Sequence, residues 1–402
     1  SWDVSKNQDG SVIAKFILSD RILRISGSGE MKKWKYDDIF DWHNSQYTNL
    51  IKIVIIENGI TNIGEKAFMY CSSLERIEIP SSVTSIGIES FRYCSNLERI
   101  EIPSSVTSIG SGAFSGCNSL VNIEIPSSVT SIGGSAFYGC SSLVNIEIPS
   151  SVTSIGSGAF SGCNSLISIN TNKGNNKYVS EEGVLFNKNK TELIKYPCKK
   201  QATKEYSIPS SVTSISESAF EECSSLERIE IPSSVTSIGR ESFRYCSSLE
   251  RIEIPNSITK IGEWAFVGCS SLIDIKIPSN ITKISRYTFW GCSNLKNIVI
   301  TNSVIDIEEG AIPKNTLIYT KANTETHRYA EEGKQGYILV GIGDLNGDGK
   351  ISLVELARIS KIGTGKITNI TEIEKMAIDV NEDGKINILD MAAISKSYKA
   401  QK

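Results

Sequence analysis

The feature that most constrains the fold of this chain is a proline that returns every 23 residues. The prolines that keep this spacing are Pro80, Pro103, Pro126 and Pro149, and then Pro209, Pro232, Pro255 and Pro278. A fixed period of this length indicates a solenoid, in which each repeat packs on its neighbours. The length of 402 residues, which exceeds the usual size of a single hydrophobic core, agrees with this interpretation.

Each repeat contains the periodicities of two short strands. The pattern Leu-x-x-Ile-x-Ile alternates as a strand does, and the proline then ends that strand because it has no N–H to donate. The segment Ser-Val-Thr-Ser-Ile-Gly predicts a second extended piece, and residues 91–94 predict a helical turn. The apolar set of one repeat is Leu74, Ile77, Ile79, Val83, Ile86, Phe91 and Cys94. No repeat can bury this set alone, so we expect about ten repeats to stack with parallel strands.

The repeats have distinct segments at both ends and one enlarged unit. Residues 1–55 lack the period, and their alternating segments at 11–19 and 21–26 predict a hairpin in an N-terminal β cap. We expect repeats over 56–320, a C-terminal cap over 321–340 and a separate module over 341–402. The long unit at 166–206 carries an insert at 170–206, with a polar loop at 172–178 and extra strands near 184–186 and 193–196.

The C-terminal module contains one acidic pattern twice. Oxygen-bearing side chains stand at positions 1, 3, 5 and 12 of each loop, and Gly at position 6 allows the sharp turn, which is the spacing of a calcium loop. The predicted ligands are Asp344, Asn346, Asp348, Lys350 and Glu355 in the first loop, and Asp379, Asn381, Asp383, Lys385 and Asp390 in the second, each Lys through its backbone carbonyl. Ser352 and Asn387, at position 9, are candidates to hold a bridging water. Three carboxylates around one point are costly without a cation, so we expect two Ca²⁺ ions.

Composition and motifs exclude several classes of protein. A formal net charge of −3 argues against nucleic acid as the main partner. The sequence contains no run of eighteen apolar residues, so it predicts no membrane-spanning helix. No signal peptide is visible, because the sequence opens directly on Ser1-Trp2-Asp3, as a mature or trimmed chain would, so this absence does not indicate a cytoplasmic protein. Nucleophile elbows, phosphate loops and zinc-ligand spacings do not occur, so we expect no catalysis.

Nine of the ten cysteines recur in register with the repeat. They are Cys71, Cys94, Cys117, Cys140, Cys163, Cys223, Cys246, Cys269 and Cys292. Equivalent side chains in stacked repeats point the same way, so their Cβ atoms stay farther apart than the ~3.8 Å that a disulfide prefers. We therefore expect a ladder of buried free thiols, which are good small fillers of a core. Cys198 lies off register and is also expected to be free.

Two sets of side chains on the repeats are candidates for a ligand surface. Where the Arg row beside the Glu row is interrupted by Asn, Glu124 and Glu147 lie in the most acidic stretch. This stretch favours either a cationic partner or ion, or simply a solvated face copied by duplication. Trp264 and Tyr287 share one repeat position, and Trp290 follows closely. These aromatic rings predict either an exposed surface that stacks on sugars or packing against the insert or the calcium module.

The repeat resembles the BspA-type leucine-rich repeat over roughly residues 51–320. The resemblance rests on Ser-Val-Thr-Ser-Ile-Gly-x-x-x-Phe-x-x-Cys-x-x-Leu-x-x-Ile-x-Ile-Pro. It implies an α/β repeat solenoid, a right-handed superhelix with a parallel β-sheet. It also implies a secreted or surface-exposed bacterial protein that recognises proteins or glycans.

The C-terminal module resembles a type I dockerin over residues 341–402. This resemblance implies a small all-α, calcium-binding pair of loop–helix segments that binds a cohesin on a scaffoldin, as in cellulosomes. The positions that read the cohesin fall on Leu353, Val354, Ser360 and Lys361, and on Ile388, Leu389, Ser395 and Lys396. The two sets are nearly duplicates, which suggests two alternative binding orientations. Glu355 stands where the family prefers Asp.

Together these features predict a secreted, non-catalytic, monomeric binding protein that is anchored in an extracellular multienzyme complex. Its partners would be a cohesin and an unknown protein or glycan. One alternative is a divergent carbohydrate-active hydrolase that uses the insert at 170–206. Another is a structural spacer or an inhibitor within the same complex.

Overall fold

The computed structural model describes residues 1–34, 45–200, 204–300, 304–345, 350–381 and 385–401. The predicted calcium ligands Asn346, Asp348 and Asp383 lie outside the described residues. The chain divides into two compact units. The first comprises Ser1–Thr203 and Ile215–Cys223, and the second comprises Lys204–Ser214 and Ser224–Lys402. Each unit is described by itself.

The first unit begins with the predicted hairpin. Strand β1 (Trp2–Asp3) pairs antiparallel with β2 (Val12–Ile17), which pairs antiparallel with β3 (Ile22–Gly27). Direction then changes, because β3 pairs in parallel with β4 (Ile53–Ile56), and β4 with β6 (Arg76–Glu78). The short helix α1 (Ser45–Thr48) precedes β4. The hairpin therefore joins the N-terminal residues to the first repeats through one continuous sheet.

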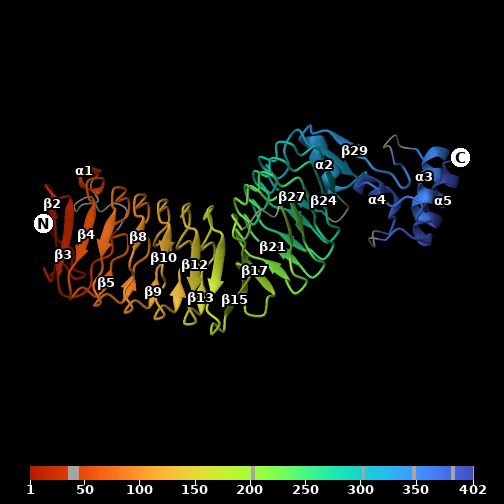
Figure 1. Cartoon of the computed structure of the whole chain (residues 1–402). Helices are drawn as coiled ribbons and strands as arrows, with labels where there is room; N and C mark the ends of the chain where they lie inside the picture. The colour runs from red at the N-terminus through yellow and green to blue at the C-terminus, as the bar shows by residue number, and fades with distance from the viewer. Residues whose placement is uncertain (35–44, 201–203, 301–303, 346–349, 382–384, 402) are drawn as a thin grey trace. The chain divides into compact units, whose positions relative to one another are not determined.

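Each regular repeat of the first unit gives one strand to each of two parallel sheets (Figure 1). One sheet has the order β14-β12-β10-β8 and the other β13-β11-β9-β7-β5. The strands of the first sheet are β8 (Arg99–Ile100), β10 (Asn122–Ile123), β12 (Asn145–Ile148) and β14 (Ser168–Thr171). Those of the second are β5 (Asn62–Ile63), β7 (Ser85–Ile86), β9 (Ser108–Ile109), β11 (Ser131–Ile132) and β13 (Ser154–Ile155). Both strand predictions for the repeat are thus confirmed.

The third side of each repeat corrects the sequence prediction, because residues 91–94 do not form a helical turn. Glu89 and Tyr93 have positive φ values of 52° and 60°. These left-handed residues turn alternate N–H groups outward, so that Phe91 N donates to Ala113 O at 2.8 Å. A helix would direct those N–H groups to carbonyls four residues earlier in its own segment. The observed turn instead bonds each repeat to the next one.

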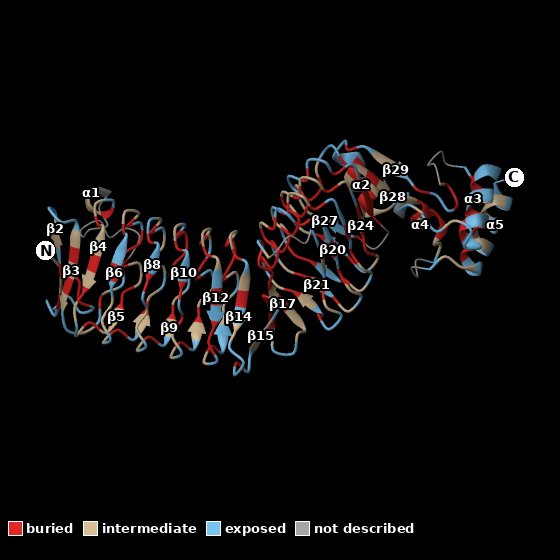
Figure 2. Cartoon of the chain, in the orientation of Figure 1, coloured by how far each residue is buried: buried red, intermediate tan, exposed pale blue. Residues whose placement is uncertain are grey.

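The core of the first unit is a column of equivalent side chains, seen as the buried positions that recur along the strands (Figure 2). The rings of Phe91, Phe114, Phe137 and Phe160 stack with centroid distances of 5.4–5.7 Å. The thiols of Cys94, Cys117, Cys140 and Cys163 each donate to the Phe carbonyl 26 residues earlier, as Cys140 Sγ does to Phe114 O at 3.2 Å. The free buried thiols are Cys71, Cys94, Cys117, Cys140, Cys163, Cys246, Cys269 and Cys292. Burial raises the pKa of the Cys117 and Cys163 thiols to about 12.

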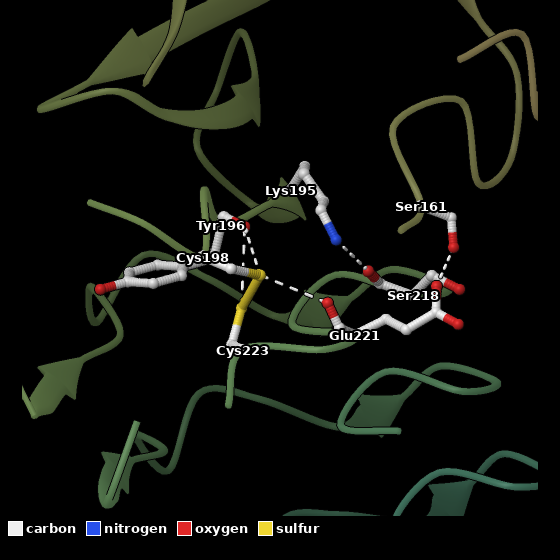
Figure 3. Close-up of a disulfide and its surroundings, with 7 residues drawn as sticks. All are labelled: Ser161, Lys195, Tyr196, Cys198, Ser218, Glu221 and Cys223. Carbon is white, nitrogen blue, oxygen red and sulfur yellow. Dashed lines mark hydrogen bonds between the residues drawn. A yellow bond between two sulfur atoms is a disulfide. The ribbon is translucent and has the colours of Figure 1, made fainter. Parts of the chain in front are cut away.

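Two cysteines contradict the prediction that all ten are free, because Cys198 and Cys223 form a disulfide (Figure 3). Their Cα atoms are 4.5 Å apart, and they are separated by 25 residues rather than 23. Cysteines at equivalent positions of stacked repeats have side chains that point the same way and stay too far apart for a disulfide, but Cys198 and Cys223 are not equivalent positions. Cys198 reaches the ladder from a position that is off register, so its sulfur meets that of Cys223.

The insert follows β14 and supplies the extra strands that the sequence predicts. Strands β15 (Tyr178–Glu181), β16 (Val184–Asn187) and β17 (Glu192–Lys195) form an antiparallel meander. The regular pattern resumes at β19 (Ser214–Ile215), and Ser216 N donates to Leu193 O at 3.0 Å. Strand β17, at the end of the meander, therefore accepts the hydrogen bond that the preceding repeat would accept in the regular stack.

The second unit continues the same architecture to a C-terminal cap. Its strands are β18 (Glu205–Ser207), β20 (Arg228–Glu230), β21 (Ser237–Ile238), β22 (Arg251–Glu253), β23 (Lys260–Ile261), β24 (Asp274–Ile277), β25 (Lys283–Ile284), β26 (Asn297–Ile300), β27 (Asp306–Ile307), β28 (Leu317–Thr320) and β29 (Tyr337–Leu339). The parallel pairings run β18-β20-β22, β21-β23, β24-β26-β28-β29 and β25-β27. Helix α2 (Glu325–Glu332), which the sequence analysis did not predict, connects β28 to β29.

The C-terminal module is helical, with α3 (Leu353–Gly363), α4 (Glu372–Ile378) and α5 (Ile388–Ala400). Its small core consists of Ile351, Ile359, Ile362, Ile378 and Ile394. A second cluster joins α4 to the cap: Val299, Val340, Met376 and Ala377 are buried together, with Tyr319 packed against them. No helix in the described part of the chain has the length and apolarity needed to cross a bilayer.

Candidate functional site

The first acidic loop is closed by the carboxylate at its last position. Glu355 is 5% exposed; its Oε1 accepts from Leu345 N at 2.7 Å, and its Oε2 from Ser352 N at 2.7 Å. In return, Ser352 Oγ accepts from Glu355 N at 3.2 Å, which makes a capping box at the start of α3. One side chain therefore ties positions 2 and 9 of the loop to the helix that follows.

The second loop repeats this construction with a shorter acid. Asp390 is 1% exposed; its Oδ1 accepts from Val380 N and its Oδ2 from Asn387 N, both at 2.9 Å. Asn387 Oδ1 accepts from Leu389 N at 2.8 Å at the start of α5. Because Glu355 and Asp390 bond to equivalent N–H groups, replacing Asp by Glu at position 12 preserves the closure of the first loop.

The donor set suits a hard cation. Asp344, Glu355 and Asp390 are at most 5% exposed, and buried carboxylates are costly unless an opposite charge or several hydrogen bonds compensate them. Their oxygens, with backbone carbonyls, are the ligands that calcium prefers. Within the described ranges no group of three metal-binding side chains is found. Asn346, Asp348 and Asp383, which would complete the two sets, lie outside those ranges.

The eight predicted cohesin-reading residues are all solvent-exposed. Four of them are large apolar side chains at the first two positions of α3 and α5. Their exposed fractions are 72% for Leu353, 79% for Val354, 80% for Ile388 and 66% for Leu389. The exposed polar residues Ser360, Lys361, Ser395 and Lys396 follow seven residues later, about two turns along the same helix faces. Each helix thus presents an apolar pair and a polar pair on one side.

The aromatic candidates on the repeats lie together but differ in exposure. Trp290 is 56% exposed, whereas Trp264 and Tyr287 are half-buried. Arg240 covers the Trp264 ring at 5.2 Å, and Arg286 covers Tyr287 at 5.1 Å. The rings of Trp264 and Tyr287 meet edge to face at 6.3 Å. Arginine stacking therefore occupies ring faces that could otherwise receive a ligand.

The acidic candidates lie on the outer face of the sheet that contains β10 and β12. Glu124 and Glu147 are exposed. Asn122 and Asn145 pair in register beside them, where the first repeat instead has Arg76, which forms an ion pair with Glu78 at 2.7 Å. No ion pair of Glu124 or Glu147 is found among the described residues.

Two features of these sites were not predicted from the sequence. Ser352 and Asn387 act as N-caps rather than only as holders of water, and the signal was present, because each precedes an acidic residue by three positions. The second feature is a pocket beside the insert, lined in part by Tyr178 and Lys195. It has no sequence signature, because it arises where a neighbouring repeat is absent.

Comparison with known families gives two matches. The model of the BspA type leucine rich repeat region matches residues 84–206 and 191–318 in 6 copies. The model of the dockerin type I domain matches residues 342–397. No curated protein matches the chain significantly.

Solved structures show the same fold. A leucine-rich repeat protein from Eubacterium ventriosum is 29% identical, with 77% of this chain and 82% of that chain covered and a TM-score of 0.68. A leucine rich cell surface protein from Faecalibacterium prausnitzii is 31% identical, with coverages of 80% and 96% and a TM-score of 0.63. The pneumococcal vaccine antigen PcpA, at 22% identity, has a TM-score of 0.60 over 78% of this chain and 85% of that chain, and shows the fold alone.

The repeat match covers more than half of the chain, and its stacked parallel strands agree with the solved relatives. The C-terminal match falls on the two capped loop–helix segments. The chain therefore belongs to the BspA-type leucine-rich repeat family and ends in a type I dockerin.

Proposed function

We propose that the chain is a secreted, non-catalytic and monomeric recognition protein of an extracellular, cellulosome-like complex. The dockerin supports the anchoring role, and the repeats support a binding role. One structural relative is described as a cell surface protein, which supports an extracellular location. In this proposal an N-terminal β cap covers 1–55, the repeats 56–320, the C-terminal cap 321–340 and the dockerin 341–402.

Calcium would be held by the two acidic loops, one ion in each. The proposed ligands are Asp344, Asn346, Asp348, Lys350 and Glu355, and Asp379, Asn381, Asp383, Lys385 and Asp390. The position-12 carboxylates support this assignment, because they are buried at the loop ends and already tie each loop to its helix. A bound ion would supply the charge that these carboxylates require and would fix the loops in the folded form.

The observation that carries the anchoring role is the exposure of the two apolar pairs. Large apolar side chains that are 66–80% exposed in a small module mark an interaction surface. The proposed cohesin contacts are Leu353, Val354, Ser360 and Lys361 on one surface, and Ile388, Leu389, Ser395 and Lys396 on the other. Because each surface has the same chemistry, either one can bind the cohesin alone.

The test is a titration of the full chain against a panel of cohesins in calcium. The first variant carries Leu353→Asp and Val354→Asp, the second Ile388→Asp and Leu389→Asp, and the third all four changes. We expect both double variants to bind almost normally and the fourfold variant to lose binding, because a carboxylate would be buried unpaired in either orientation. A double variant that loses all binding would refute two interchangeable surfaces. No binding of any cohesin by the intact chain would refute the anchoring role.

The repeats offer a second, weaker candidate surface. The exposed Trp290 beside Trp264 and Tyr287 favours a glycan or protein ligand, and Glu124 and Glu147 favour a cationic one. On a glycan and protein array, loss of a ligand in Trp290→Ala but not in Tyr138→Ala, a matched exposed aromatic elsewhere in the stack, would assign that ligand to the aromatic surface. A hydrolase panel on the same chain tests the alternative that the insert at 170–206 is catalytic, since release of products would refute a purely binding role.

A further inference from the structure

A pocket of about 400 Å³ lies beside the insert, entirely within the first unit. One wall is the turn segment of the last regular repeat, which includes Gly158 and Phe160. The other walls include Tyr178, Glu192 and Lys195 of the insert. Figure 3 shows the neighbouring interior, where Lys195 points toward the backbone of the following repeat. The pocket is distinct from the dockerin and from both surfaces considered above.

The turn segment that lines the pocket has hydrogen-bond donors without acceptors. In the regular stack, alternate N–H groups of this segment donate to the next repeat, as Phe137 N does to Ala159 O at 2.8 Å. The equivalent donors of the last regular repeat are the N–H groups of Gly158, Phe160 and Gly162. None of the described residues accepts a hydrogen bond from them. Three donors with one orientation therefore end the stack, and Gly158 and Phe160 lie in the pocket wall.

The insert shows that this edge takes acceptors from outside the regular pattern. On the same edge, Ile155 N donates to the Tyr178 hydroxyl at 2.8 Å, in place of the missing neighbouring strand. Lys195 is 3% exposed and donates to Ser218 O at 2.9 Å, so its positive charge lies in the wall. The described residues of the insert thus supply a hydrogen-bond acceptor to Ile155 N but none to the N–H groups of Gly158 and Phe160 beside the pocket.

The edge does not suit an added β-strand. Its carbonyl groups are already used, since Ala159 O accepts from Phe137 N and Ser161 O accepts from Gly139 N. An extended peptide would present alternating N–H and C=O groups to an edge that offers donors only. A matching ligand must instead place several oxygen acceptors along one side.

The remaining polar groups indicate a neutral ligand with hydroxyl groups. The lining contains Lys177 and Lys195 but also Glu192 and Glu217, so its formal charges balance. Each of these carboxylates accepts from one serine hydroxyl at 2.5 Å and has capacity for further donors. A sugar hydroxyl both accepts from an N–H and donates to a carboxylate. The volume falls in the range of small-molecule sites, roughly 300–1,000 Å³.

We propose that this pocket binds a short neutral oligosaccharide. Its oxygens accept from the N–H groups of Gly158 and Phe160, and its hydroxyls donate to Glu192 and Glu217. This site is separate from the cohesin contacts, so its failure would leave the anchoring role intact.

The direct test follows backbone amide resonances of the isotope-labelled full chain during titration with neutral gluco-, xylo- and manno-oligosaccharides of two to four units. Saturable shifts are expected at Gly158, Phe160 and Gly162, with little change at Phe137, whose N–H already has an acceptor. The same titration is repeated with a library of extended peptides. Absence of shifts with every sugar, or shifts with peptides alone, would overturn the proposal.

A matched pair of variants checks the location. Ser157→Trp fills the pocket from its exposed rim, whereas Ser111→Trp places the same side chain at the equivalent exposed position of a regular repeat. We expect the first to weaken binding by roughly tenfold or more and the second to leave it unchanged. Glu192→Gln should also weaken binding without filling the pocket. Equal affinity in Ser157→Trp and Ser111→Trp would place the sugar elsewhere and overturn the assignment.

Discussion

The repeat stack and the dockerin are both built by repetition, yet they bury their cores in different ways. In the stack, Phe137 lies between Phe114 at 5.5 Å and Phe160 at 5.7 Å, so each repeat completes its neighbours on both sides. In the dockerin, two copies share one small core of five isoleucines, and the acids Glu355 and Asp390 are buried beside it. Stability is spread over many similar contacts in the stack, whereas in the dockerin it depends on one core and on its charges.

Removal of calcium should produce the largest loss of structure, and this loss should be confined to the dockerin and spare the repeat stack. With chelator, the loop carboxylates would be buried without a cation, so α3 and α5 should lose protection against hydrogen exchange. Strands β10 and β12 should remain protected, because their contacts involve no ion. Restoring calcium is the control. Helices α3 and α5 that stay protected in chelator would show that the isoleucine core is sufficient alone.

Truncation of a stacked ring tests the shared core of the repeats. Phe137→Ala should cost about 3–5 kcal/mol, because both neighbouring rings lose a contact and a cavity remains. Phe160→Ala should cost less, since the pocket rather than another Phe of the regular column lies beyond that repeat. Hydrogen exchange of β9, β11 and β13 measures both costs. Equal costs would mean that contacts on the insert side replace the missing ring fully.

Reduction is the counterpart of chelation, because all ten cysteines belong to the repeat region and none to the dockerin. Thiol titration of the denatured protein should find eight free thiols before reduction and ten afterwards. Replacing Cys198 by Ala should weaken the region around the insert by about 2–4 kcal/mol, the usual effect of opening a disulfide loop. Finding ten free thiols without reductant would show that the disulfide does not form.

Substitution of one buried thiol of the ladder should lower stability only around that repeat. Cys140→Ser should cost about 1–3 kcal/mol, since the site is spaced for sulfur, at 3.2 Å from Phe114 O, and a hydroxyl prefers a shorter bond. Cys140→Ala separates the loss of that bond from the loss of volume. A serine variant as stable as the wild type in chemical denaturation would show that the hydroxyl finds a full partner.

The smallest expected effect concerns an ion pair of the dockerin. Burial raises the pKa of Glu374, but hydrogen bonds from Arg358 and Thr371 outweigh it, so the pKa lies below its usual 4.5. A depressed carboxyl pKa stabilises the fold above the unfolded value, and this contribution is lost as pH falls through the folded value. In saturating calcium, the difference in melting temperature between wild type and Glu374→Gln should therefore shrink from pH 6 to below pH 4.5. A constant difference would exclude the ionised pair as its cause.

Much of this comparison could be predicted from the sequence, for physical reasons that differ between regions. The strands follow from the period, because the proline and the alternation recur at fixed positions. The turn was mistaken for a helical turn, since Phe and Cys three residues apart fit a helix equally well. Its left-handed residues include Glu89 and Trp264, which have no chemistry in common that would mark the conformation.

The features that escaped prediction depend on departures from the repeat. Cys198 was expected to be free because it lies off the 23-residue register. Only the folded insert brings it close to Cys223, and the sequence does not show that proximity. The pocket arises from a neighbour that is absent, and the sequence of the residues beside it is unchanged. In the dockerin, by contrast, Leu353 and Ile388 were named through the resemblance to the family, which fixes their positions in each loop–helix segment, and both side chains are exposed in the structure.

The in-register hydrogen bonds between repeats also have a genetic consequence. Ser105, Ser128 and Ser151 each donate to a Val carbonyl 22 residues earlier, at 2.6 Å in every case. Gain or loss of a whole unit between them would leave each junction chemically the same. Unequal recombination among segments that encode nearly identical repeats can therefore change the number of repeats without creating a new interface. Variation in length between strains should accordingly fall among the regular repeats before the insert and occur in whole steps.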